Sequence, residues 1–177
     1  MKKINVITLG CSKNTVDSEH LMAQLAAAGY TVTHDSDRTD AKVVVINTCG
    51  FIESAKTEAI ENILEACSYK QQNPNLKVVV TGCLAERYRS QIEEEIPEVD
   101  AVVGCASNKA IDTIVARLFH GENHLESYGA KKDFPLGGKR VIGTPAHYAY
   151  LKIAEGCNNR CHYCAIPGIR GPLHSRD

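Results

Sequence analysis

Three cysteines near the C-terminus have the spacing that most directly predicts chemistry. Three residues separate Cys157 from Cys161, and two separate Cys161 from Cys164. A 4Fe-4S cluster needs thiolates that converge from one tight loop, and this spacing supplies them. Three protein ligands leave one iron open, where S-adenosylmethionine could bind through its amino and carboxylate groups. The sequence therefore predicts a 4Fe-4S cluster that cleaves S-adenosylmethionine to a radical.

A zinc site is the alternative interpretation of this loop. His162 or His174 could complete a set of three cysteines and one histidine. Zinc-binding loops more often use paired two-residue spacings, so we favour the iron–sulfur interpretation. We favour a purely structural role for these three cysteines less still.

A second group of cysteines follows three apolar runs in the first part of the chain. Cys11, Cys49 and Cys83 each come directly after a run expected to form a strand, and each has a glycine beside it. The carboxyl ends of parallel strands open onto one crevice, where ligands bind. Three unrelated core cysteines are the alternative, but those should lie within strands or on apolar helix faces. We therefore expect Cys11, Cys49 and Cys83 to form a second metal site.

Two further cysteines are expected to have different roles. Cys105 also follows a short apolar run and could be a fourth member of the crevice, although we favour a structural role for it. Cys67 lies on the apolar stripe of a predicted helix, which favours a place in the core.

The elements that must position these cysteines alternate between strands and helices. Strands are expected at about 4–9, 43–46, 76–81 and 101–103, and helices at about 15–28, 53–69, 84–95 and 111–119. Ser107 or Asn108 is expected to cap the last helix. This alternation predicts right-handed βαβ units and an α/β doubly wound parallel sheet. We expect this domain over residues 1–120, a linker over 121–146, and the start of a second domain over 147–177, with a strand at 148–153.

Composition limits the class of protein. The chain has 177 residues with a formal net charge of −1, so no strong electrostatic attraction to nucleic acid is expected. No apolar run approaches the roughly 20 residues of a membrane span, and no signal peptide is recognisable. We therefore expect a cytoplasmic protein with no membrane partner. In a reducing compartment its eight cysteines are not expected to form a disulfide framework.

The motif that contains the C-terminal cysteines resembles the radical S-adenosylmethionine superfamily. Its spacing and the aromatic Tyr163 directly before Cys164 carry this resemblance. In that superfamily the loop follows the first strand of a partial β/α barrel, which 148–153 would provide. The resemblance implies that Tyr163 binds the cofactor together with the three cysteines.

The N-terminal motifs narrow the resemblance to the methylthiotransferase family of these enzymes. Residues 9–14, 47–52 and 81–84 read Leu-Gly-Cys-Ser-Lys-Asn, Asn-Thr-Cys-Gly-Phe-Ile and Thr-Gly-Cys-Leu, and each is similar to a ligand-bearing motif of the family. The resemblance implies a second 4Fe-4S cluster on Cys11, Cys49 and Cys83. Residues 47–52 and 155–161 resemble the branch that modifies a ribosomal protein more than the branch that modifies tRNA.

This resemblance implies a specific reaction. One S-adenosylmethionine gives a methyl group to a sulfur held on the N-terminal cluster, and a second is cleaved at the C-terminal cluster to a 5′-deoxyadenosyl radical. The radical removes hydrogen from the β-carbon of an aspartate in small-subunit ribosomal protein S12, and the methylthio group is transferred there. An external electron donor is required, and no side chain of this chain is singled out as a catalytic acid, base or nucleophile.

The resemblance ends with the first strand and the cluster loop of the barrel. We therefore expect an incomplete piece of the enzyme that is inactive by itself. Two other functions remain open at this point. One is a tRNA adenosine methylthiotransferase, with tRNA as the partner. The other is a non-catalytic iron–sulfur or electron-transfer module.

Overall fold

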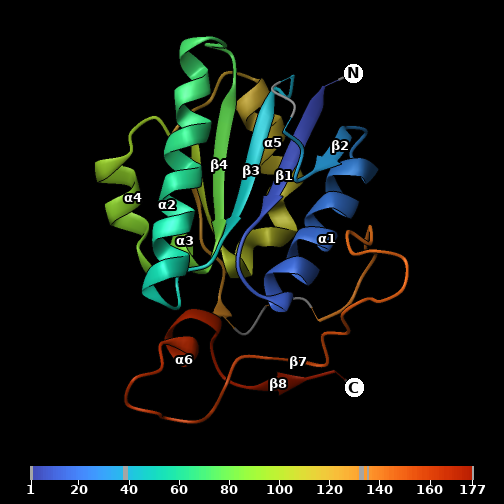
Figure 1. Ribbon diagram of the computed structural model, residues 1–177, viewed down its shortest axis with the longest axis vertical. Helices are drawn as coiled ribbons and strands as arrows, with labels where there is room; N and C mark the ends of the chain where they lie inside the picture. Colours follow the sequence, from blue (N-terminus) through green and yellow to red (C-terminus); the bar gives the residue numbers. More distant parts are fainter. Residues whose placement is uncertain (1, 38–39, 132–133, 135, 177) are drawn as a thin grey trace.

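A six-stranded parallel sheet organises most of the chain (Figure 1). The computed structural model describes residues 2–37, 40–131, 134 and 136–176. The strand order is β2-β1-β3-β4-β5-β6, and every neighbouring pair is parallel. The strands are β1 (Lys3–Thr8), β2 (Thr31–His34), β3 (Val43–Thr48), β4 (Lys77–Gly82), β5 (Ala101–Gly104) and β6 (Leu125–Ser127). The predicted α/β doubly wound parallel sheet is confirmed.

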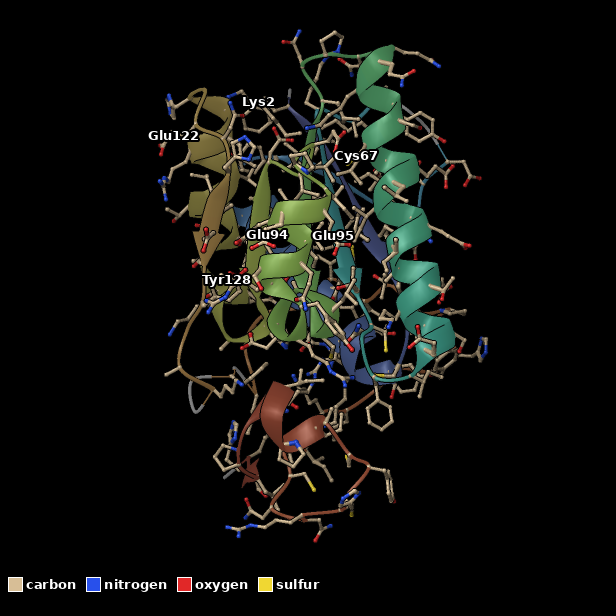
Figure 2. The ribbon with its side chains drawn as sticks, turned by 90° about the vertical axis from the view of Figure 1, so that its left-hand side faces the viewer. Lys2, Cys67, Glu94, Glu95, Glu122 and Tyr128 are labelled. Carbon is tan, nitrogen blue, oxygen red and sulfur yellow. The ribbon has the colours of Figure 1, made fainter. Side chains whose placement is uncertain are left out.

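Helices cover both faces of this sheet, because the central strands are apolar on both sides. Val43 and Val45 of β3 face one core with α1 (Ser12–Ala27) and α5 (Ile111–Phe119). Val44 and Ile46 face the other core. That core is completed by α2 (Glu53–Ser68), α3 (Cys83–Arg87) and α4 (Arg89–Glu95). Cys67 lies in this second core on the sheet-facing side of α2 (Figure 2), as predicted.

The chain reverses its direction of travel across the sheet at β1, which lies between β2 and β3. Such a reversal opens a crevice at the carboxyl ends of the strands. Figures 1 and 2 both place the last part of the chain, coloured orange to red, beyond this edge of the sheet. The predicted cysteine crevice and the C-terminal cysteine loop therefore lie at the same end of the molecule.

Several local predictions need correction. β2 is missed in the sequence because its residues are only half buried and lack an apolar run. The single helix expected at 84–95 is two helices, which are separated at Tyr88 by a non-helical backbone (φ −122°, ψ 34°). Neither Ser107 nor Asn108 caps α5, because a 3-10 helix over Cys105–Ala110 precedes it. Asn108 instead accepts a hydrogen bond from the Thr81 hydroxyl at 2.6 Å.

The strand expected at 148–153 is wrong. Among the described residues of 147–177, the strands are β7 (Ala154–Glu155) and β8 (His174–Ser175), which pair antiparallel with each other and not with the main sheet. A strand needs a neighbour to complete its hydrogen bonds, and no described strand runs beside 148–153. The apolar side chains of Leu151 and Ile153 are exposed, whereas Lys152 between them is buried. The radical-enzyme barrel itself stays a prediction.

The remaining segment contains β6, which lies within the stretch predicted as a linker, and α6 (Ile166–Arg170). Residues 132–133 and 135 of that stretch, and residue 177 of the predicted second domain, lie outside the described residues. The division at 120 and 146 stays a prediction. No helix among the described residues is long and apolar enough to cross a membrane.

Candidate iron–sulfur site

The register of the sheet brings cysteines into one row at its carboxyl edge. Thr48 of β3 pairs with Gly82 of β4, and Gly82 pairs with Gly104 of β5. Cys49, Cys83 and Cys105 each follow one of these three residues directly. Equal register therefore places the three thiols side by side across neighbouring strands.

Cys11 completes the predicted group from the end of β1. It is the N-cap residue of α1, where the positive end of the helix dipole favours negative charge. The preceding Gly10 has φ +93°, and a β-carbon there would lie 2.4 Å from the β-carbon of Cys49 and 3.1 Å from its sulfur. Only glycine allows this backbone to pass so close to Cys49. Cys11 and Cys49 are therefore brought together by the turn after β1.

Asn14 fixes this turn in place. Its side-chain amide donates to the carbonyl oxygens of Leu9 at 2.9 Å and Thr48 at 3.0 Å. These bonds tie the first turn of α1 to the ends of β1 and β3. The side chain of Asn47 in turn donates to the carbonyl oxygen of Asn14 at 2.9 Å. Asn14, three residues after Cys11, and Asn47, two residues before Cys49, thus tie the ends of β1 and β3 together.

The thiols differ in exposure and charge. Cys11 is exposed, whereas Cys49, Cys83 and Cys105 are buried, and all are free of disulfides. Burial raises the pKa of Cys49, and the nearby Cys83 and Cys11 sulfurs raise it further. A hydrogen bond with the Cys105 thiol, helped by the Arg170 guanidinium, lowers the pKa of Cys83. That hydrogen bond and burial raise the pKa of Cys105.

Cys83 is also the sulfur of this group that has a guanidinium nitrogen beside it, that of Arg170 at 3.5 Å. Cys105 lies in the same row and packs with Cys83 in a small buried cluster that includes Phe134 and Ile169. Cys67 lies outside the row, and burial raises its pKa to about 11, in the same direction as the pKa values of Cys49 and Cys105. Its place in the core cluster beneath α2 distinguishes it from the strand-end cysteines.

The second predicted group, Cys157, Cys161 and Cys164, lies on the loop after β7. Cys161 is exposed, and Cys157 and Cys164 are partly exposed. The Cys157 amide donates to the Gly171 carbonyl at 3.1 Å, and the Cys164 amide donates to the Cys161 carbonyl at 3.0 Å. Tyr163, the predicted cofactor-binding aromatic, is 85% exposed. The loop is therefore tied at its base, while Cys161 and the ring of Tyr163 are exposed.

A buried network of charges joins this loop to the sheet domain, and the sequence analysis missed it. Lys152 lies 2.6 Å from Asp17 and 2.5 Å from Glu155. Arg170 lies 3.0 Å from Asp17 and 2.9 Å from Glu155. Burial opposes the charge on Glu155, but Arg170, Lys152 and Lys13 lower its pKa to about 2. One sequence signal could have found the network, namely a lone lysine within the apolar run at 148–153.

The two cysteine groups fit iron–sulfur clusters in their donor chemistry. Free thiols reach one edge from three strand ends, with a guanidinium beside one of them, which suits an anionic cluster. Among the described residues, no three Cys, His, Asp or Glu side chains converge closely enough to hold a single metal ion. A four-iron cluster holds its thiolates farther apart than a single ion does. Both ligand sets remain predictions.

Comparisons with known proteins give the chain a context. The family model described as "Uncharacterized protein family UPF0004" matches residues 3–104. A curated protein of Caldicellulosiruptor saccharolyticus named "Ribosomal protein uS12 methylthiotransferase RimO" is 46% identical over 178 residues, which cover 99% of this chain and 40% of that relative. A protein of the same name from Bacteroides fragilis is 48% identical over 175 residues, which cover 99% of this chain and 38% of the relative.

These matches confirm the resemblance drawn from the motifs, including the likeness to the branch that modifies a ribosomal protein. The chain spans about 40% of the length of the curated relatives that it matches. The matched family region contains Cys11, Cys49 and Cys83, whereas Cys157, Cys161 and Cys164 lie beyond it.

Proposed function

The chain belongs to the protein family described as uncharacterized protein family UPF0004, and we propose that it forms part of a radical S-adenosylmethionine methylthiotransferase. The proposed substrate is an aspartate β-carbon of ribosomal protein uS12, which is the protein that the relatives' printed name gives as their target. A substrate on the ribosome would place the activity in the cytoplasm. An external electron donor is part of the proposal.

The observation that carries the proposal is the row of strand-end cysteines at the carboxyl edge of the sheet, at the end of the molecule where the second cysteine loop also lies. A C–H bond without acidity needs a radical rather than a base, and a sulfur donor must be kept near it. Two separate sulfur-ligand sets at one end of the molecule suit both needs. When bound, two 4Fe-4S clusters and S-adenosylmethionine would supply the radical and sulfur chemistry.

The residues of the chain would bind and orient these groups. Cys11, Cys49 and Cys83 would hold the cluster in the crevice, with Gly10 leaving room for close approach of the backbone. Cys157, Cys161 and Cys164 would hold the other cluster, and Tyr163 would contact S-adenosylmethionine beside it. The tie between Cys157 and Gly171 would keep the base of this loop fixed while its sulfurs remain accessible.

The first test is an anaerobic reconstitution with iron and sulfide counting. We expect about eight irons per chain, as two clusters of four. Replacing Cys11, Cys49 and Cys83 together by alanine should remove half of the iron. Cys67→Ala is the matched control, because Cys67 is a buried cysteine of the core and should leave the iron count unchanged. Full iron in the triple variant would contradict the crevice site.

The second test concerns the substrate. Mass spectrometry of uS12 and of bulk tRNA from a deletion strain should show loss of a methylthio group from uS12 and an unchanged tRNA. Loss of a methylthio-nucleoside with intact uS12 would instead assign the chain to tRNA modification. If neither uS12 nor tRNA changes in the deletion strain, the chain is not part of a methylthiotransferase for either substrate, and only the cluster-binding module remains.

A further inference from the structure

Arg170 is a buried cation in direct contact with a cysteine of the crevice. It ends α6 and is 1% exposed. One guanidinium nitrogen lies 3.5 Å from the Cys83 sulfur and donates to the Asn14 side-chain oxygen at 2.8 Å. A fully buried arginine is costly unless its surroundings supply negative charge. The negatively charged groups around Arg170 therefore show which charges its guanidinium neutralises.

Arg170 shares its carboxylates with other cations of the network. Asp17 and Glu155 are the two carboxylates of the network. Lys152 bridges both of them, and Lys13 reaches Glu155 at 3.1 Å. Lys152 and Arg170 are the buried cations, whereas the side chain of Lys13 is 40% exposed and its charge is solvated. Arg170 is the buried cation that also contacts the Cys83 sulfur. A thiolate, or an anionic cluster bound through it, would therefore lie directly against the guanidinium.

Arg170 also lies between the two cysteine groups. Its other nitrogen donates to Glu155 at 2.9 Å, and Glu155 is two residues before Cys157. The next residue, Gly171, accepts the hydrogen bond from the Cys157 amide. Gly171 has φ +75°, and a β-carbon there would lie 2.8 Å from the Lys131 β-carbon. The segment 170–171 thus contacts the crevice on one side and the base of the second loop on the other.

We propose that Arg170 is a positioning residue that sets the charge at the crevice cluster and fixes the C-terminal cysteine loop against it. This inference rests on the proposed function, because it needs a cluster on Cys11, Cys49 and Cys83. A fixed positive charge in a buried site favours the more negative, reduced form of a cluster. The arginine therefore makes the crevice cluster easier to reduce and holds it beside the second site.

The test measures the reduction potential of the crevice cluster by itself. In the whole protein, Cys157, Cys161 and Cys164 are replaced by alanine, so that only the crevice cluster remains. Arg170→Gln removes the charge and Arg170→Lys keeps it. Arg140→Gln is the matched control, because Arg140 also neutralises a buried carboxylate, that of Glu19 at 3.1 Å, while its other contact is the Tyr150 carbonyl.

We expect a more negative potential in Arg170→Gln, a smaller shift in Arg170→Lys, and no shift in Arg140→Gln. An unchanged potential in Arg170→Gln with full iron would overturn the inference while leaving the proposed function intact. Absence of iron from the parent protein would instead overturn the proposed function. If Arg170→Gln loses its cluster, the Arg170→Lys variant distinguishes charge from shape. A cluster retained in Arg170→Lys supports the role of the positive charge, and a cluster lost in Arg170→Lys refutes it.

Discussion

Replacing Gly10 by alanine tests how closely the crevice is packed. Gly10 has φ +93°, a backbone region that costs a residue with a β-carbon about 1–2 kcal/mol. The new β-carbon would also lie 2.4 Å from the β-carbon of Cys49, closer than van der Waals contact allows. Relieving such a contact in a packed interior costs about 1–3 kcal/mol more. We therefore expect Gly10→Ala to lower the free energy of unfolding by about 2–5 kcal/mol.

Gly29 offers a matched control. It has φ +87°, but a β-carbon there would meet no atom within 4 Å. Gly29→Ala should therefore show only the backbone cost of about 1–2 kcal/mol. Both substitutions restrict the unfolded chain equally, so that contribution cancels between them.

Urea unfolding followed by circular dichroism measures both variants, with the midpoint compared at constant slope. The difference between them, about 1–3 kcal/mol, is the part that comes from contact with Cys49. Equal destabilisation of Gly10→Ala and Gly29→Ala would refute the close approach of the β1 turn to Cys49. If Gly10→Ala folds fully but binds less iron on reconstitution, the contact with Cys49 also determines how the cysteines are placed to bind the cluster.

The remaining predictions concern the buried charge network. Lys152→Met removes the buried cation that bridges Asp17 and Glu155 and should cost about 3–5 kcal/mol in urea unfolding. The control Lys3→Met, which breaks a pair with the exposed Asp40, should cost less than about 1 kcal/mol. Because the pKa of Glu155 is lowered to about 2, its contribution is complete above its unfolded pKa of about 4.5 and is lost as the pH falls towards 2. On acidification, the Glu155→Gln variant should therefore lose about 2–3 kcal/mol less of its free energy of unfolding than the parent protein does. Parallel curves of stability against pH for the variant and the parent protein would contradict the network.

Much of the fold could be predicted from local patterns. The β-branched run at β3 identifies a strand buried on both faces, and the apolar stripe of α2 places Cys67 in the core. The helical stripe is visible because burial repeats along α2 with the period of a helix, and β3 is visible because its β-branched residues are uninterrupted. The strand β2 was not predicted because its half-buried residues show no such pattern. The expected strand at 148–153 failed because an apolar run cannot show whether a pairing partner exists.

The sequence by itself determined the two cysteine groups, because ligand spacing and position after a strand are local properties. It also placed Cys11, Cys49 and Cys83 at one edge, since parallel strands end together. Only the tertiary structure decided that Cys105 lies in their row and that Lys152 and Arg170 are buried. Lys152 and Asp17 are 135 residues apart, and Arg170 and Asn14 are 156 apart. A charged residue is normally solvated, so its burial depends on distant partners that no local pattern contains.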